Sequence, residues 1–347
     1  MKILMIGPAR SVNGGISAVV NNYYKAGLDK EVKLEYIGTM EDGSKWHKLK
    51  IVMKAFVEFI VKVSKYELVH VHMASDSSLY RKLPFICLTK MFGKKLIIQQ
   101  HGGNIKYFYY SECGEKRQQF IKKILRKADV FLVVAPYLKD IFKDIVEEEK
   151  IIIFPNAIEI PTKIEPNYSK QNLLFLGRLC QEKGINELLE AVKGLKQEFP
   201  DLQLYLGGVW VEEELQKKAE KCGDFVHYLG WIDAEKKKEY LQKCNLFVLP
   251  TYFEGLPMSL LEGMAYGCAC VATEVGGIPQ VMADRKDGLM IPAKDVQVLK
   301  DAIRELLGKP DLQKEIGMNE RKTVESNYEI VTSVNNLVGL YKHLCDE

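Results

Sequence analysis

Two glutamates that lie close together in the sequence have the types and spacing for chemistry. Seven residues separate Glu254 from Glu262, and Gly255, Leu256 and Pro257 are among them. The apolar run before them predicts a strand, so Glu254 falls in the following loop, and Pro257 suits a helix start. The carboxylates can accept hydrogen bonds from vicinal hydroxyls of a sugar or ribose, and amides around Gly255 and Leu256 can face a phosphate. Alternatively, Glu262 only stabilises a helix dipole.

Two cations follow another predicted strand. Arg178 comes after the run Asn172–Leu176, and Lys183 follows five residues later, just before a predicted helix. A diphosphate leaving group needs cations, because negative charge builds on it as the sugar–oxygen bond breaks. A fork-shaped guanidinium and a point-like ammonium can share this work. Surface charge is the alternative, but cations are poorly placed at a helix start, which favours the functional interpretation.

A glycine pair in the first half has a similar position. Gly14 and Gly15 follow the predicted strand Lys2–Gly7 and precede a predicted helix. Paired glycines let the backbone approach a ligand, and the helix N-terminus behind them favours phosphate. The Gly-x-Gly-x-x-Gly fingerprint of dinucleotide-binding proteins is absent. The loop is therefore a candidate phosphate loop or simply a turn.

The elements that must position these residues alternate along the whole chain. Strand-like runs and amphipathic helical runs follow one another, which predicts an α/β protein with mostly parallel sheets, whose ligands bind at the carboxyl ends of the strands. A segment at 156–167, with two prolines and no periodicity, interrupts the alternation. The expected strands span 2–7, 33–37, 68–72, 95–99, 130–134 and 151–154 before this segment, and 172–176, 203–206, 225–229, 246–249, 269–272 and 288–291 after it.

The interruption divides the chain into two doubly wound domains. We expect an N-terminal domain at 1–165 and a C-terminal domain at 166–327, with a last helix at about 328–347 that packs back on the first domain. A length of 347 residues fits two domains of roughly 150 residues each.

Composition and spacing exclude several classes of protein. No apolar run reaches the roughly 18 residues of a membrane span, and the apolar start is too short for a signal peptide, so we expect a cytoplasmic protein. The eight cysteines form no Cys-x-x-Cys pair, and the six histidines have no metal-site spacing. His70 and His72 share one strand face without a third ligand, which suggests strand-end residues. The sequence Asp-x-Asp is absent, so no metal is indicated at a diphosphate.

Positive charge is concentrated in the first half. Residues 1–165 hold nine more Lys and Arg than Asp and Glu, whereas the remainder holds six more acids, which gives the net charge of +3. Most of the excess lies between 43 and 130. It suggests an anionic partner such as a phospholipid surface or a lipid diphosphate, and not nucleic acid; a lysine-rich solvated surface is the alternative.

These motifs together resemble the retaining glycosyltransferases of family 4, the "glycosyl transferases group 1" proteins with the GT-B fold. The resemblance covers nearly the whole chain and is most specific in the second half. There the Glu, seven residues, Glu pattern matches Glu254 to Glu262, and the Gly-Arg…Lys-Gly segment matches 177–184. The first half matches at Gly14-Gly15, at the strand end Gln100-His101-Gly102 and at Pro155-Asn156.

The resemblance implies an α/β fold of two Rossmann-like doubly wound parallel-sheet domains facing a central cleft. The first domain would lie on the acceptor side, and the second would bind the nucleotide sugar. The donor-binding residues would be Gly14, Gly15, Arg178, Lys183, Gly255, Leu256, Pro257 and Glu262.

Within this set the resemblance assigns individual roles. Arg178 and Lys183 would hold the diphosphate, and Glu262 the ribose. Gly15 would close over the phosphates from the other domain. The catalytic residues would be Glu254, near the anomeric carbon, and His101, facing the donor sugar from the first domain. A lone histidine at a strand end is commonly structural, but the glycines after His101 and the family match favour a functional role.

We therefore predict a retaining, hexosyl-type glycosyltransferase without cofactor or metal. It would move a sugar from a nucleotide diphosphate, UDP rather than GDP, to a saccharide or lipid-linked acceptor in bacterial surface polysaccharide biosynthesis. The route would be a front-face displacement in which the departing diphosphate helps deprotonate the acceptor hydroxyl. The basic first half would contact the inner face of an anionic membrane. The alternatives are a nucleotide-sugar epimerase or phosphorylase of the same fold, and a non-catalytic nucleotide-sugar-binding protein.

Overall fold

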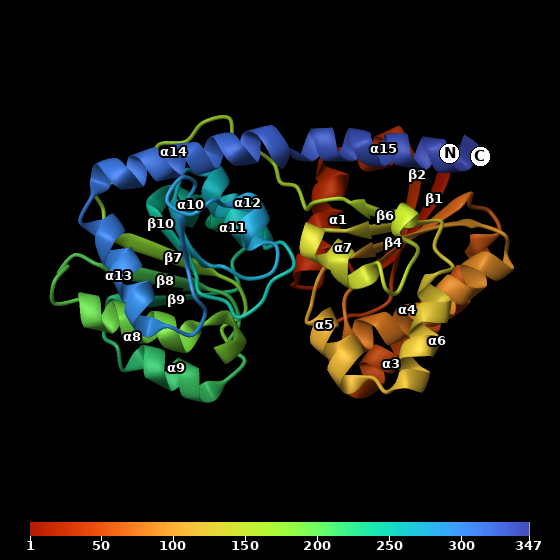
Figure 1. The fold of residues 1–347 in the computed structure, drawn as a ribbon, viewed down its shortest axis with the longest axis horizontal. Coiled ribbons are helices and arrows are strands. Elements are labelled where there is room, and N and C mark those ends of the chain that lie inside the picture. The colour runs from red at the N-terminus through yellow and green to blue at the C-terminus, as the bar shows by residue number, and fades with distance from the viewer. Residues whose placement is uncertain (347) are drawn as a thin grey trace. The chain divides into compact units, whose positions relative to one another are not determined.

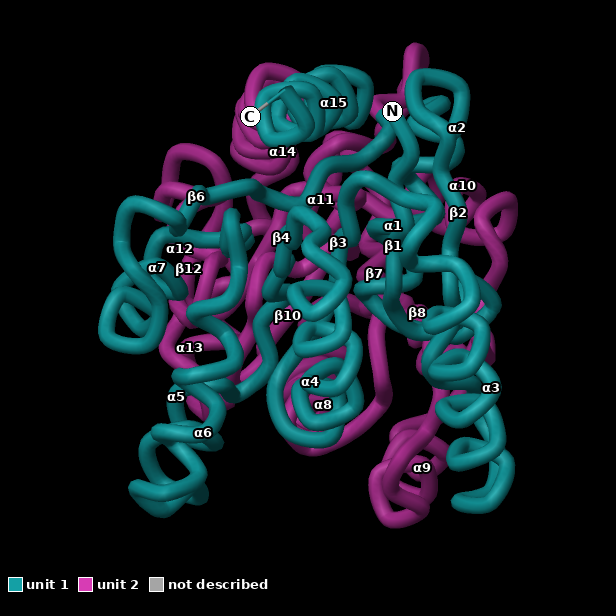
Figure 2. Tube along the Cα trace, turned by 90° about the vertical axis from the view of Figure 1, so that its right-hand side faces the viewer, with its two compact units in different colours: residues 1–159, 330–347 teal, residues 160–329 magenta. Residues whose placement is uncertain are grey.

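The structure is a computed structural model that describes residues 1–346. Figure 1 labels its elements, and Figure 2 distinguishes its two compact units. Unit 1 holds Met1–Glu159 and the C-terminal segment from Ile330, and unit 2 holds Ile160–Glu329.

Unit 2 begins six residues before the expected boundary at 165/166, because the linker is bound to unit 2. Arg321 donates a hydrogen bond of 2.7 Å from Nη2 to the carbonyl of Pro161. The Tyr168 hydroxyl donates one of 2.8 Å to the carbonyl of Gly267. Residues 160–165 therefore pack with the second half of the chain, although their sequence has no periodicity.

Unit 1 is built on a six-stranded parallel sheet in the order β2-β1-β3-β4-β5-β6. Its inner strands are runs of aliphatic residues buried on both faces, as parallel sheets covered by helices require. The strands are β1 (Lys2–Gly7), β2 (Lys33–Gly38), β3 (Leu68–Met73), β4 (Lys95–Gln100), β5 (Val130–Val133) and β6 (Ile151–Ile153).

The helices of unit 1 come from both ends of the chain. The C-terminal helix α15 (Ile330–Asp346) belongs here, because the Tyr341 hydroxyl lies 2.6 Å from Nδ1 of His70 in β3. The other helices are α1 (Gly15–Lys25), α2 (Leu28–Glu31), α3 (Lys45–Val63), α4 (Asp76–Met91), α5 (Ile105–Tyr107) with the π-turn η1 (Phe108–Glu112), α6 (Glu115–Leu125), α7 (Pro136–Phe142) and the short 3-10 helix η2 (Glu148–Lys150).

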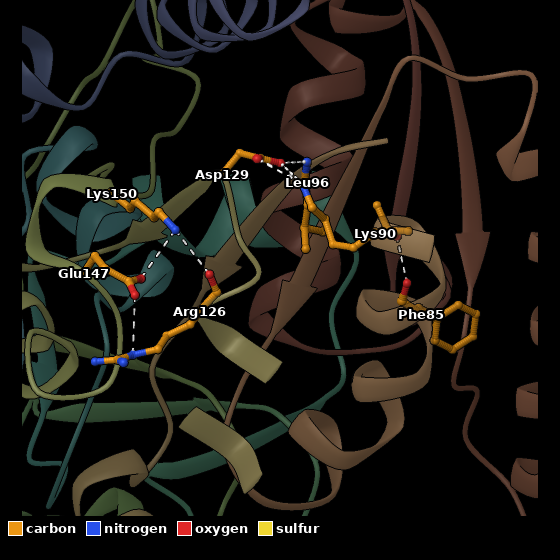
Figure 3. A network of polar contacts seen from close by, with 8 residues as sticks. Phe85, Lys90, Leu96, Arg126, Asp129, Glu147 and Lys150 are labelled. Atoms are coloured by element: carbon orange, nitrogen blue, oxygen red, sulfur yellow. Dashed lines mark hydrogen bonds and ion pairs between the residues drawn. The ribbon is translucent and has the colours of Figure 1, made fainter. Parts of the chain in front are cut away.

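Polar contacts fix the amino edge of this sheet (Figure 3). Asp129, just before β5, accepts hydrogen bonds from the backbone amide of Leu96 at 2.7 Å and from Lys90 Nζ at 2.8 Å. Arg126 and Lys150 both contact the Glu147 carboxylate, at 3.5 and 3.4 Å. Such partly exposed ion pairs stabilise little individually, but they anchor the edge opposite the one that carries the predicted site residues.

Unit 2 repeats the architecture with a parallel sheet in the order β12-β11-β10-β7-β8-β9. The strands are β7 (Asn172–Leu176), β8 (Gln203–Gly207), β9 (Val226–Gly230), β10 (Leu246–Leu249), β11 (Ala269–Thr273) and β12 (Leu289–Ile291). The helices are η3 (Gln181–Lys183), α8 (Ile185–Leu195), α9 (Glu213–Glu220), α10 (Ala234–Lys243), α11 (Met258–Ala265), α12 (Ile278–Val281), α13 (Val296–Leu307) and α14 (Pro310–Asn327).

The predicted fold class is confirmed. All twelve expected strands are present with ends within one residue, and both sheets are parallel and doubly wound. Across the described part of the chain, 1–346, no helix is long and apolar enough to cross a membrane.

Candidate active site

The loop that carries Glu254 is fixed by contacts with the neighbouring strand end. It follows β10, and its Thr251 carbonyl accepts a hydrogen bond of 2.6 Å from the Thr273 hydroxyl at the end of β11. The turn after β11 packs directly on Glu254. Gly276 has φ +59°, and a Cβ there would lie 1.9 Å from the Glu254 carbonyl oxygen. Only glycine fits this turn, a constraint that sequence reasoning missed although Gly276-Gly277 is visible in the sequence.

Lys183 and Glu254 meet at the carboxyl edge of the sheet. The Lys183 ammonium forms an ion pair with the Glu254 carboxylate, and both side chains are mostly buried. The strands before them, β7 and β10, are neighbours, so their loops emerge side by side. A backbone hydrogen bond of 2.9 Å from Tyr252 to Glu182 joins the two loops. The structure thus brings together two residues that were predicted separately.

A second glycine makes this junction possible. Gly184, directly after Lys183, has φ +70°, and a Cβ there would lie 2.0 Å from the carbonyl oxygen of Pro250. A side chain at this position would push the loop after β7 away from the loop after β10. Steric fit therefore explains why a glycine follows the lysine in the 177–184 motif: Gly184 lets Lys183 reach Glu254.

Glu262 has a different cationic partner. It lies in the second turn of α11, and its Oε1 is 2.5 Å from Nζ of Lys237 in α10. Both side chains are mostly buried. Lys237 was not among the predicted residues, because no motif links it to Glu262 across 25 positions.

Arg178 is held by its backbone while its side chain is exposed. The adjacent Leu179 amide donates to the Val209 carbonyl at 2.9 Å, beside the end of β8. The Arg178 side chain is 63% exposed, and its only described charged neighbour, Glu182, is 4.0 Å away. Such an exposed pair is weak, so the guanidinium can turn to an anionic ligand at little cost.

The start of α11 adds backbone donors. Gly255, Leu256 and Pro257 are buried, and Pro257 occupies the position before the first turn. Among the residues described, no side chain caps this end of the helix. Its first amides can therefore serve an anion, in keeping with the helix dipole.

Gly14 and Gly15, in unit 1, begin α1 without crowding. A Cβ on either residue would have no described atom within 4 Å. Unlike Gly184 and Gly276, these glycines are not required by packing within the described structure. The space around the backbone is what a phosphate-approaching loop needs, and it is also compatible with a simple turn.

His101 lies at the end of β4 and joins a stack of three histidines. Its Nε2 is 2.8 Å from Nδ1 of His72, and the His70 and His72 rings stack with centroids 4.4 Å apart. His70 and His72 were expected to be simple strand-end residues; both are fully buried inside β3, and His72 orients the predicted catalytic ring.

Burial keeps these imidazoles neutral. It lowers the pKa of His70 to about 3 and that of His101 to about 4, the latter partly offset by a hydrogen bond with the Asn156 side chain, while the pKa of His72 lies well below its ordinary value. At neutral pH His101 can therefore act as a neutral hydrogen-bonding group and not as a cation.

The geometry of both units agrees with the comparisons to known proteins. The family model of the glycosyl transferases group 1 matches residues 156–323, which cover most of unit 2. An uncharacterized glycosyltransferase of Methanocaldococcus jannaschii is 24% identical over 93% of both chains. The phosphatidyl-myo-inositol mannosyltransferase of Mycobacterium leprae is 32% identical over 167 residues, 44% of each chain. The structure of Anabaena HepE in complex with UDP and glucose has a TM-score of 0.78 and 15% identity over 99% of each chain.

The fold is thus the GT-B fold of glycosyltransferases, and the protein is a glycosyltransferase. Its residues 156–323 match the family model of the glycosyl transferases group 1, as the resemblance of the motifs in the second half predicted.

Proposed function

We propose that this protein is a retaining glycosyltransferase that transfers a hexosyl group from a nucleotide-diphosphate sugar, UDP rather than GDP, to a saccharide or lipid-linked acceptor. Bacterial surface polysaccharide assembly is the process that we propose for it. The presence of UDP and glucose in the complex of the similar Anabaena structure supports a UDP donor. The similar mycobacterial enzyme, a phosphatidyl-myo-inositol mannosyltransferase, supports a lipid-linked acceptor.

The observation that carries the proposal is the contact between Lys183 and Glu254, whose loops also carry Arg178 and lead into α11. A diphosphate needs cations and N–H groups where its charge develops, and a carboxylate is needed where positive charge develops on the sugar. In our proposal the Lys183 ammonium contacts a phosphate oxygen while it still touches Glu254, so the carboxylate lies close to the anomeric carbon.

The other predicted residues complete the donor site. Arg178 takes the second share of the diphosphate charge, and Glu262, positioned by Lys237, accepts hydrogen bonds from the ribose. The roles of Gly14, Gly15 and His101, which belong to unit 1, remain predictions that substitutions must test. We propose that the departing diphosphate takes the acceptor proton and that no metal is required, since cations and helix amides already balance its charge.

A panel of UDP and GDP sugars tests the proposal. The purified protein should release free nucleotide slowly from one UDP sugar, and faster when a lipid extract supplies acceptors. Proton NMR of the product should show the anomeric configuration of the donor, and EDTA should leave the rate unchanged. Interconversion of donor sugars without any acceptor would instead identify an epimerase, and binding without turnover would identify a sensor.

A further inference from the structure

We propose that the outer face of α3 (Lys45–Val63) lies in the headgroup region of an anionic phospholipid bilayer. The inference specifies which surface of unit 1 contacts the membrane. Only the biological role of this contact, which is access to a lipid-linked acceptor, rests on the proposed function.

The outer face of α3 is apolar and exposed. Its positions recur at intervals of three and four residues, so they form one continuous stripe along the helix. Trp46, at the first turn, is 81% exposed. The stripe consists of Trp46, Leu49, Met53, Val57, Ile60 and Val61, all of them exposed. A stripe of this size on one helix is typical of a binding surface and not of the scattered exposed apolar residues found on any protein.

The inner face of the same helix is already packed. Ala55, Phe59 and Val63 are buried, and the Phe59 ring meets Phe85 of α4 edge to face at 5.3 Å. The core of unit 1 therefore explains only one face of α3. Its outer apolar stripe needs another partner.

The charges that border the stripe are positive. Lys45, Lys50 and Lys54 are all exposed and lie three or four residues from positions of the stripe. The one acidic residue of α3, Glu58, binds Lys62 at 2.6 Å, and Lys62 also contacts Glu35 of β2. The exposed face therefore combines three lysines with an apolar stripe, the composition of helices that lie at a membrane interface.

This charge pattern favours a lipid surface over a second copy of the chain. In a symmetric dimer the α3 faces of both copies would pack against each other. The two sets of lysines would then come close together and repel each other. An anionic bilayer satisfies both features, since its headgroups attract the lysines and its acyl region accepts the apolar side chains. At 1.5 Å per residue the helix is about 28 Å long, and no helix in residues 1–346 qualifies as a membrane span, so α3 would lie on the bilayer and not cross it.

The direction of α3 connects this surface with the sheet edge of unit 1. Ser44 caps the helix, accepting a hydrogen bond from the His47 amide at 3.2 Å, and the helix follows β2. Its N-terminal turn, with Trp46, therefore begins at the carboxyl edge of the sheet, the edge at which the loop of Gly14 and Gly15 emerges. A cavity of about 500 Å³ lies between α3 and this loop, and its charged lining residues are Arg10, Lys54, Glu35, Glu41 and Glu58. A bilayer on the outer face would thus deliver the head of a lipid-linked acceptor to the working edge of unit 1.

Vesicle flotation with the full chain tests the proposal without any donor. We expect binding to phosphatidylcholine vesicles that contain phosphatidylglycerol, weak binding to pure phosphatidylcholine, and a blue shift of Trp46 fluorescence that Trp46→Phe removes. The triple variant Leu49→Gln, Met53→Gln, Val57→Gln should bind at least about tenfold more weakly. Replacing Lys50 and Lys54 by Gln should cost about fivefold per lysine.

The matched control is Met91→Gln, which removes a 79% exposed apolar side chain at the end of α4 in the same unit. It should bind like the wild type, and far-UV circular dichroism should show every variant folded. Equal binding of the α3 variants, or no binding of the wild type to anionic vesicles, would overturn the proposal. A dimeric wild type whose triple variant is monomeric in light scattering would assign the stripe to a second copy instead.

Donor turnover, measured without vesicles, keeps the two proposals apart. The triple variant Leu49→Gln, Met53→Gln, Val57→Gln, whose positions do not line the cavity, should release nucleotide from the donor as fast as the wild type. A protein that binds vesicles but turns over no nucleotide sugar contradicts the proposed function and leaves this inference standing.

Discussion

Lys183 and Glu254 stand 71 positions apart in the sequence, yet their side chains form an ion pair at the carboxyl edge of the second sheet. The contact exists because β7 and β10 are neighbours and because two glycines let the loops close on each other. It links a cation suited to a departing diphosphate with a carboxylate suited to the sugar that loses it, so substitutions at the two positions should have different effects.

Glu254→Gln should abolish transfer while the fold persists. The amide keeps the shape of the side chain but removes the negative charge that stabilises the sugar in the transition state, so kcat should fall by about a thousandfold. Rates of nucleotide release and the melting temperature check this. Glu213→Gln, an exposed acid on α9, is the control and should be silent. Wild-type turnover in the Glu254 variant would remove its assigned role.

Lys183→Gln and Arg178→Gln should weaken the binding of UDP. Each loses a charge-assisted hydrogen bond to the diphosphate, which corresponds to about tenfold or more in Kd. Calorimetric titration with UDP measures it, with Lys217→Gln, an exposed lysine of α9, as the control. Unchanged affinity in both variants would mean that the diphosphate binds elsewhere.

Gly276→Ala should damage the Glu254 loop. The added Cβ would meet the Glu254 carbonyl oxygen at 1.9 Å, so the loop must move, and we expect a loss of at least about 2 kcal/mol in the free energy of unfolding together with weaker donor turnover. Gly230→Ala is the matched control: its φ is also positive, +68°, but a Cβ there meets no described atom within 4 Å, so it should cost only about 1 kcal/mol. Equal losses in urea denaturation would show that strain, and not the close contact, is what matters at Gly276.

Unit 1 should lose stability when the solution is acidified. The pKa of His70 is about 3 in the folded protein and 6.5 when unperturbed, so below pH 6.5 the unfolded chain binds more protons and the free energy of unfolding falls as the pH drops. Between pH 7 and pH 5 this residue alone accounts for up to about 2 kcal/mol. Well above pH 6.5 the His70 imidazole is neutral in both the folded and the unfolded chain, so it adds no further pH dependence to the free energy of unfolding.

His70→Gln isolates this effect, because the amide can still hydrogen bond with the Tyr341 hydroxyl but does not titrate. Urea denaturation of the variant at pH 7 and pH 5 should show a smaller loss than the wild type by about that amount. Identical losses in both proteins would assign the acid sensitivity to other groups.

The strands, the fold class and the spacing of the two glutamates could be predicted from the sequence, because each depends on residues that are close together in the chain. Runs such as Leu246–Leu249 alternate with helices and place the strands, and the spacing between Glu254 and Glu262 fits one loop and one helix. The remaining features depend on contacts between distant segments. Lys237 reaches Glu262 from another helix, and His72 orients His101 from a neighbouring strand, without any pattern in the sequence.

Gly276 shows the same limit. The glycine is visible in the sequence, but its necessity comes from the Glu254 carbonyl 22 positions earlier, which only the folded loop brings near it. The boundary between the units follows the same rule, since Arg321 and not the local sequence holds the linker at Pro161.

Because α15 supplies Tyr341 to the sheet that begins at Lys2, unit 1 cannot be completed before α15 has been synthesised. Unit 2 is synthesised earlier as one continuous segment, so it can fold while the first 159 residues still lack their last helix. During translation the half with the apolar stripe is therefore the last to mature.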